Sequence, residues 1–284
     1  MIPAAFDYVA PSTVDEAVRA LAEAGEDAKL LAGGQSLLPV LRMRLAAPST
    51  VVDLGRISEL RGVSEDGDAL VIGAMTTHYE VQRDPLVAEH AALLARATDT
   101  VADPQVRHRG TFGGSLAHAD PAGDLLAPAL ALDAEMVVAG PDGRRTVPAS
   151  EFFTDLFTTA MDAGEILVAV RVPKHTGWRA HYEKFNRVAQ AWSMVAVAAA
   201  VRADGGNIAE ARVGLTNMAS VPVRARAVEE ALVGRPATAE AVRAAAEHAA
   251  EGTSPPTDGN ADADYRRHLA KVLTGRAVLA AMAG

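Results

Sequence analysis

Up to about residue 176, short apolar runs alternate with amphipathic stretches, a pattern typical of mixed helix and strand. A capping box, Thr13-Val-Asp-Glu16, predicts a helix over residues 14–24 that ends at Gly25. A second box, Thr77-His-Tyr-Glu80, begins another helix, and Pro85 begins a third that runs to about residue 97. Short buried strands are predicted at residues 30–31, 51–54 and 70–73.

The pattern changes near residue 176, after which three strand-like runs follow one another. The sequence Ala203-Asp-Gly-Gly-Asn207 between the last two predicts a hairpin. We therefore divide the chain into an α/β domain, residues 1–176, and a smaller α+β domain, residues 177–284. The later predicted strands are 136–138, 146–147, 166–172, 178–185, 194–201 and 208–215. The later predicted helices are 125–132, 223–232, 239–251 and 265–283.

Two double-glycine segments stand out, Ala32-Gly33-Gly34-Gln35-Ser36 and Thr111-Phe112-Gly113-Gly114-Ser115. The first is predicted to form a tight turn between a buried strand and a short helix. Glycine lets a ligand approach the backbone closely, and the start of a helix offers free N–H groups to a phosphate. Two such loops suggest that they bind opposite sides of one pyrophosphate. The alternative is that these are ordinary turn glycines.

Neither loop matches the two commoner phosphate-binding motifs. The chain has no G-x-G-x-x-G after its first strand, so the dinucleotide fingerprint of a Rossmann unit is missing. It also has no G-x-x-x-x-G-K-[ST], which argues against a P-loop.

Composition narrows the classes of function. The 284 residues carry a formal net charge of −9, which argues against nucleic acid as the main partner. No cysteine is present, so a cysteine-ligated iron–sulfur centre would have to lie on another polypeptide. The N-terminal residues show no signal-peptide pattern, and the longest apolar stretch, 195–201, is too short to span a bilayer. We therefore expect a cytoplasmic protein, and the scattered histidines predict no metal site.

The sequence around both loops resembles the FAD-binding flavoprotein (medium) subunits of molybdenum hydroxylases, of the CO dehydrogenase and xanthine dehydrogenase types. The resemblance covers essentially the whole chain. It is carried by residues 31–45, 51–54 and 165–173, and most closely by Val106-Arg-His-Arg-Gly-Thr-Phe-Gly-Gly-Ser-Leu-Ala-His-Ala-Asp-Pro-Ala-Gly-Asp124. It implies an α+β fold, in which a two-subdomain FAD-binding α/β domain of the PCMH type precedes a smaller domain with a three-stranded antiparallel sheet and helices.

The resemblance also implies a set of FAD-binding residues and no catalytic acid or base, because the flavin itself carries the redox chemistry. The set is Ala32, Gly33, Gly34, Gln35, Ser36, Leu37, Thr111, Gly113, Gly114, Ser115, His118, Asp120, Asp124, Leu167, Lys184 and Trp192. Gln35 and Ser115 stand where the family often has His and Asn, and both keep the capacity to donate hydrogen bonds. His118 is expected to contact FAD or to serve the structure.

Four members of this set have alternative interpretations. The resemblance implies that Asp124 contacts sugar hydroxyls of FAD, whereas its position before an apolar helix predicts an N-cap, and Asp120 fits a turn. Lys184 is implied to lie near the flavin ring, where a cation favours anionic reduced flavin, but it could be a solvated strand lysine. Trp192 would stack on the ring or lie buried in the core.

The implied function is that of an electron-transfer subunit. Electrons would pass from a large molybdopterin subunit, through a small [2Fe-2S] subunit, to FAD here and on to NAD, a quinone or oxygen. A dimer of heterotrimers is the implied assembly, and the substrate site would lie on another chain. Two alternatives stay open: a flavin-free assembly or binding module that keeps the fold, and a self-sufficient oxidase of the same broad FAD fold.

Overall fold

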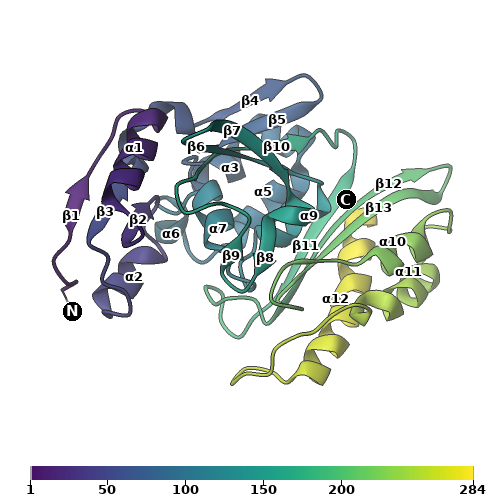
Figure 1. Cartoon of the computed structure of the whole chain (residues 1–284). Helices are drawn as coiled ribbons and strands as arrows, with labels where there is room; N and C mark the ends of the chain where they lie inside the picture. The colour runs from purple at the N-terminus through teal and green to yellow at the C-terminus, as the bar shows by residue number, and fades with distance from the viewer. Residues whose placement is uncertain (1, 284) are drawn as a thin grey trace.

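The computed structural model describes residues 2–283 and arranges them as three successive lobes, each built on its own sheet (Figure 1). In the N-terminal lobe both outer strands pair in parallel with a central β3. Because parallel neighbours need crossover connections, a helix returns the chain between successive strands. The strands are β1 (Asp7–Val9), β2 (Ala28–Leu31) and β3 (Thr50–Asp53), and the helices are α1 (Val14–Ala24) and α2 (Leu37–Arg42), followed by the 3-10 turns η1 (Leu54–Arg56) and η2 (Ser58–Leu60).

The central lobe is a five-stranded antiparallel sheet of order β4-β5-β10-β6-β7, with short helices packed on it. Its strands are β4 (Val63–Asp66), β5 (Ala69–Gly73), β6 (Glu135–Gly140), β7 (Gly143–Pro148) and β10 (Ile166–Pro173). A two-stranded hairpin, β8 (Phe153–Asp155) and β9 (Thr158–Thr159), is attached to it. Its helices are α3 (His78–Arg83), α4 (Pro85–His90), α5 (Ala92–Asp99), α6 (Pro104–Arg107), α7 (Phe112–His118) and α9 (Ala149–Phe152).

The C-terminal lobe is an antiparallel sheet of order β11-β12-β13-β14, covered on one side by helices (Figure 1). The apolar strand β12 sends alternate side chains to two cores, because successive residues of a strand point to opposite faces. Val195, Val197 and Val201 face the helices, whereas Ala196 and Ala198 face the central lobe. The elements are β11 (Arg179–Phe185), β12 (Val195–Asp204), β13 (Asn207–Thr216), β14 (Val223–Arg224), α10 (Arg226–Leu232), α11 (Ala239–Ala246), η3 (Glu247–Ala250) and α12 (Ala263–Ala283).

The apolar helix α8 (Leu126–Ala131) joins the central and C-terminal lobes. It is buried along its whole length and packs on β12, β13 and β14. The approach to β13 is close, since a Cβ placed on Gly214 would lie 2.5 Å from the carbonyl oxygen of Ala127. A helix that precedes the predicted domain boundary is thus docked on the sheet that follows it.

Most predicted elements are present, although the short elements β1, β4, β8, β9, α6 and α9 were not predicted. The structure differs from the predictions at four further places. The predicted helix 85–97 is split at Ala91, because the carbonyl of His90 accepts a hydrogen bond from the N–H of His175 and leaves the helix. Residues 223–224 form a strand that pairs with β13, so the predicted three-stranded sheet has a fourth, two-residue strand. The helix predicted over 239–251 ends in a 3-10 turn. The second glycine segment is itself helical.

Candidate functional site

The first glycine loop presents a row of free backbone donors. It follows β2 and leads into α2, and Gly34 adopts a φ of 76°, a conformation that glycine tolerates without a steric penalty. None of the N–H groups from Gly33 to Leu37 donates a hydrogen bond within residues 2–283. Adjacent free N–H groups at the start of a helix are typical of an anion-binding site.

The two glycine loops lie against each other. A Cβ on Gly33 would lie 2.6 Å from the Cα of Gly110 and closer still to the carbonyl oxygen of Arg109. A Cβ on Gly114 would lie 3.2 Å from the Cβ of Ala32. Glycine at position 33 is therefore required by close contact between the loops, which makes them parts of one site rather than two unrelated turns.

The second loop differs from the first, because its own donors are mostly used within the protein. Thr111 caps α7 by accepting the N–H of Gly114 at 3.2 Å, and the hydroxyl of Ser115 donates to the carbonyl of Phe112 at 3.0 Å. The N–H of Gly113 donates to the carbonyl of Ala74 at 2.9 Å, and a Cβ here would overlap Ala74. The two loops are therefore not equivalent, although the sequence predicted two phosphate-binding loops of the same kind. The first loop offers free N–H groups, and the second supports it.

Asp124 is the centre of a buried polar cluster between the lobes. Only 6% of the residue is exposed, and its Oδ1 accepts hydrogen bonds from the hydroxyls of Tyr182 at 2.9 Å and Ser193 at 2.8 Å. Its Oδ2 lies 2.7 Å from the Nζ of Lys184. Burial raises the pKa of Asp124, and the Lys184 charge and the hydrogen bonds oppose that shift.

This geometry changes two predictions. Asp124 is not an N-cap, since Leu125 precedes α8 without a side-chain cap and the carboxylate of Asp124 faces the C-terminal lobe. Lys184 is not a solvated lysine, because its side chain is buried and donates to the carbonyl of Thr100 at 3.0 Å as well as to Asp124.

Three members of this cluster were missed from the sequence: Tyr182, Ser193 and Asn217. The amide of Asn217 donates to the carbonyl of Ser193 at 2.8 Å, and its N–H donates to the carbonyl of Pro121 at 2.9 Å. Tyr182 could have been found, because it lies two residues before Lys184 on a predicted strand and so shares its face. No sequence signal places the other two beside Asp124.

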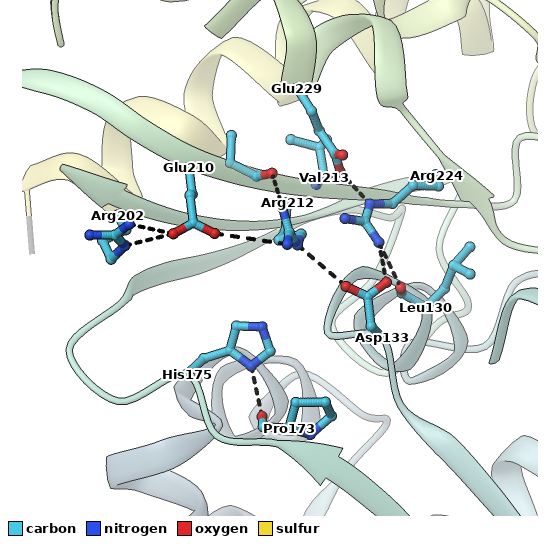
Figure 2. Close-up of polar contacts among 11 residues, drawn as sticks. Leu130, Asp133, Pro173, His175, Arg202, Glu210, Arg212, Val213, Arg224 and Glu229 are labelled. Carbon is cyan, nitrogen blue, oxygen red and sulfur yellow. Dashed lines mark hydrogen bonds and ion pairs between the residues drawn. The ribbon is translucent and has the colours of Figure 1, made fainter. Parts of the chain in front are cut away.

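A second ionic cluster fixes the opposite end of α8 (Figure 2). Asp133 pairs with Arg224 at 2.9 Å and with Arg212 at 3.4 Å, both from the C-terminal lobe. Arg224 also donates to the carbonyl of Leu130 at 3.1 Å and pairs with Glu229. Since Asp124 lies before α8 and Asp133 after it, both ends of the helix are tied to the C-terminal lobe, which holds the carboxylate of Asp124 in place.

Comparison with known proteins assigns this arrangement to a family. Residues 4–175 match the FAD binding domain in molybdopterin dehydrogenase, and residues 180–281 match the CO dehydrogenase flavoprotein C-terminal domain. The chain belongs to the FAD-binding medium chains of the molybdopterin dehydrogenases. The resemblance seen in the sequence is confirmed, as are the mixed two-part fold and FAD as the cofactor.

Relatives of this medium chain match it over nearly its full length. It is 43% identical to the carbon monoxide dehydrogenase medium chain of Hydrogenophaga pseudoflava, covering 100% of this chain and 99% of that one. It is 38% identical to the same subunit of Afipia carboxidovorans, covering 98% and 97%. The solved structure of carbon monoxide dehydrogenase from Hydrogenophaga pseudoflava, lacking the Mo-pyranopterin moiety, superposes with a TM-score of 0.96 at 45% identity, covering 100% and 99%.

The other predicted FAD-binding residues lie in different surroundings. His118, at the end of α7, packs on the ring of Phe157 with centroids 5.1 Å apart. Asp120 accepts the N–H of Ala122 at 2.9 Å, as a turn residue does, and Leu167 is buried on β10. Trp192 is exposed, so its alternative as a buried core residue is wrong. Leu167 belongs to the same buried core cluster as Phe112 of the second glycine segment.

His78 lies beneath the second loop and was also missed. Its N–H donates to the carbonyl of Gly110 at 2.9 Å, and its Nδ1 is buried without a partner among the described residues. Burial, with a smaller contribution from Arg107, lowers the pKa of His78 to about 4. The ring is therefore neutral near pH 7.

We expect His78 to make the medium chain acid-sensitive. Below pH 6.5 the unfolded chain binds a proton at this position and the folded chain does not, down to the folded pKa of about 4. The free energy of unfolding should thus fall by about 3 kcal/mol between pH 7 and pH 4 from this group alone. Urea titrations over this range should show a smaller loss in His78→Phe than in the wild type. Equal losses of unfolding free energy in the two proteins would contradict this role of His78.

Among residues 2–283 no helix is both long and apolar enough to cross a membrane. The same residues contain no group of three or more His, Cys, Asp or Glu side chains arranged to hold a metal ion.

Proposed function

We propose that this medium chain binds FAD with the pyrophosphate against the first glycine loop, and passes electrons from a partner subunit to an external acceptor. The observation that carries the proposal is the row of free N–H groups from Gly33 to Leu37, held against the second loop. A dianionic pyrophosphate satisfies such donors and is favoured at the start of a helix. A flavin-free module would leave these donors to water alone, so the observation favours a bound cofactor.

The remaining loop residues fit around the pyrophosphate with defined roles. Gln35 is exposed beside the free N–H groups and can turn its amide to a phosphate oxygen, releasing its contact with the carbonyl of Gly33 at 3.2 Å. Thr111 and Ser115 present hydroxyls from the second loop, although each already makes one internal hydrogen bond. Because a hydroxyl both donates and accepts, each can still bind the cofactor.

Asp124 and Lys184 pair with each other, and this pairing limits the contacts that they can make with the cofactor. Tyr182 and Ser193 use Oδ1 of Asp124, and Lys184 uses one position on Oδ2, so one acceptor position remains for a sugar hydroxyl. The paired Lys184 and Asp124 carry no net charge together. We therefore infer that Lys184 stabilises negative charge on a reduced flavin less than an unpaired lysine would.

The chemistry that FAD supplies is acceptance and release of electrons singly or in pairs. Since the 284 residues include no cysteine, we infer that the electrons arrive from a small [2Fe-2S] subunit, itself supplied by a large molybdopterin subunit. We propose that the complex is a dimer of heterotrimers and that its electron acceptor is NAD, a quinone or oxygen. We also propose that this chain divides into two domains near residue 176. The cytoplasmic location stays a prediction. The relatives' designation as medium chains argues against a self-sufficient oxidase.

We expect the purified chain to retain FAD without a covalent bond and to prefer it to FMN. FMN lacks the pyrophosphate, so it cannot fill the row of donors between Gly33 and Leu37. Heat denaturation and filtration should release a flavin that chromatography identifies as FAD. Reloading of the flavin-free chain should give a much lower dissociation constant for FAD than for FMN. Flavin that stays with the denatured polypeptide, or FMN alone in the filtrate, would contradict the proposal.

A further inference from the structure

The backbone beside Ser193 is held in place by contacts with other parts of the chain. The hydroxyl of Ser193 donates to Oδ1 of Asp124 at 2.8 Å. The peptide group between Ser193 and Met194 is used at both ends. Its N–H donates to the carbonyl of Phe185 at 2.9 Å, and its carbonyl accepts from the amide of Asn217 at 2.8 Å. These contacts leave Ser193 little freedom to turn away from Asp124.

Arg266 on α12 holds the next carbonyl of the same segment, that of Met194. The side chain of Arg266 is fully buried. Its Nη1 donates to the carbonyl of Met194, and its Nη2 lies 2.7 Å from Oδ2 of Asp258, whose side chain is 42% exposed. The Nε of Arg266 has no hydrogen-bond partner among residues 2–283. Because a buried charge with a half-exposed partner and an unused donor adds little to stability, we expect this arginine to serve the geometry of the segment that it holds.

Asn217 holds the preceding carbonyl from a backbone conformation that few residues other than glycine accept. Its φ is 61°, in the left-handed region that asparagine tolerates better than most residues. Its N–H donates to the carbonyl of Pro121 at 2.9 Å, while its amide holds the carbonyl of Ser193. Since Pro121 precedes Asp124 by three residues, Asn217 fixes the segment that carries the carboxylate against the segment that carries the hydroxyl. An unfavourable backbone conformation of this kind persists where the surrounding contacts require it.

We propose that Arg266 and Asn217 are positioning residues of the FAD site, which act on Asp124 through Ser193. The hydroxyls of Ser193 and Tyr182 occupy Oδ1 of Asp124, and so fix the direction in which the carboxylate offers its remaining acceptor position. If Ser193 moved, the carboxylate could turn, and a sugar hydroxyl of FAD would meet it in poorer geometry. The inference rests on the proposed function, because it concerns the affinity of the same FAD site.

The test removes each of the two side-chain donors from the full-length chain. Arg266→Met leaves the carbonyl of Met194 without its donor. Asn217→Gly loses the amide but keeps the backbone, because glycine accepts a φ of 61° without a steric penalty. We expect each variant to raise the dissociation constant of FAD about tenfold, the effect of one misplaced hydrogen bond to a charged group. The constant is measured by titrating FAD-free protein with FAD and following flavin fluorescence.

The control for a general loss of stability is Leu232→Ala. Leu232 on α10 is fully buried in the core between the C-terminal sheet and its helices. Its truncation should lower the free energy of unfolding, measured by urea titration of the FAD-free chain, and leave the FAD dissociation constant unchanged. Arg266→Met or Asn217→Gly protein that is less stable but binds FAD as tightly as the wild type would show a structural role alone, and would overturn the inference.

A double-variant cycle with Ser193→Ala tests whether Arg266 acts through Ser193. In the Ser193→Ala background, Arg266→Met should raise the dissociation constant less than about twofold, because the hydroxyl that it positions is already gone. Full additivity of the two substitutions would contradict the proposed route.

Two further outcomes are decided in advance. If Arg266→Met did not fold, the FAD affinity of Asn217→Gly would decide alone. If the wild-type chain bound no FAD, the proposed function and this inference would both fail. Wild-type FAD binding that neither variant weakens would leave the proposed function standing and remove only the positioning role.

Discussion

Gly33→Val is expected to abolish FAD retention. A side chain at position 33 would overlap the backbone of Arg109 and Gly110 and push the two glycine loops apart. The free N–H groups that follow Gly33 would then no longer converge on one pyrophosphate, and a β-branched residue would add local strain. We expect the flavin-to-protein ratio, measured from absorbance spectra of the purified chain, to fall from near one to below about a tenth, since each 1.4 kcal/mol of lost binding is tenfold.

The matched control is Gly259→Val. A Cβ on Gly259 would meet no atom within 4 Å, and the residue does not adopt a positive φ, so valine fits there. This variant should keep its FAD. Circular dichroism should show that both variants retain the fold. A folded Gly33→Val protein with wild-type flavin content would refute the role of the first loop.

Asp124→Asn is expected to lower the free energy of unfolding by about 3–5 kcal/mol, because it leaves the buried charge of Lys184 without its partner. Tyr182 and Ser193 would also lose a charged acceptor. Urea titration of the FAD-free chain measures this loss without a contribution from cofactor binding. FAD affinity should decrease as well, although less than in Gly33→Val.

Two further variants separate loss of the ion pair from other effects. Adding Lys184→Met to Asp124→Asn removes the orphaned charge and should recover most of the lost stability. Asp264→Asn breaks an exposed pair with Arg267 and should cost less than about 1 kcal/mol. If Asp124→Asn behaved like Asp264→Asn, the carboxylate would not be the centre of a buried cluster.

Local sequence signals predicted helices, strands and turns well where no distant residue competes for the same backbone groups. Thr77 and Glu80 form the predicted capping box, and the Gly205-Gly206 turn joins β12 to β13. Thr13 also caps its helix, but Glu16 bonds Ser12 instead of completing the predicted box. The predictions failed where a distant residue competes for the same backbone group. His175 takes the carbonyl of His90 and splits a helix, and pairing with β13 turns residues 223–224 into a strand.

The two glycine loops of the candidate site could be predicted from the sequence, but the residues that pack against them and around Asp124 could not. The glycine pairs mark the loops because glycine has recognisable conformational uses. That Gly33 meets Gly110, or that Ser193 and Asn217 complete the Asp124 cluster, depends on packing between residues far apart in the chain. The same limit applies to Asp124, whose local sequence fits a helix cap but whose partners come from the C-terminal lobe.

We expect this chain to carry FAD and to receive its electrons from other subunits. Anaerobic titration with the substrate of the complex, followed by the visible absorbance of the oxidised flavin, tests it most directly. The FAD-loaded chain alone should keep its absorbance when substrate is added, and should lose it on adding dithionite. The same chain assembled with its partner subunits should lose the absorbance on adding substrate. Substrate-dependent bleaching of the isolated chain would contradict the account, because it would place the whole reaction on these 284 residues.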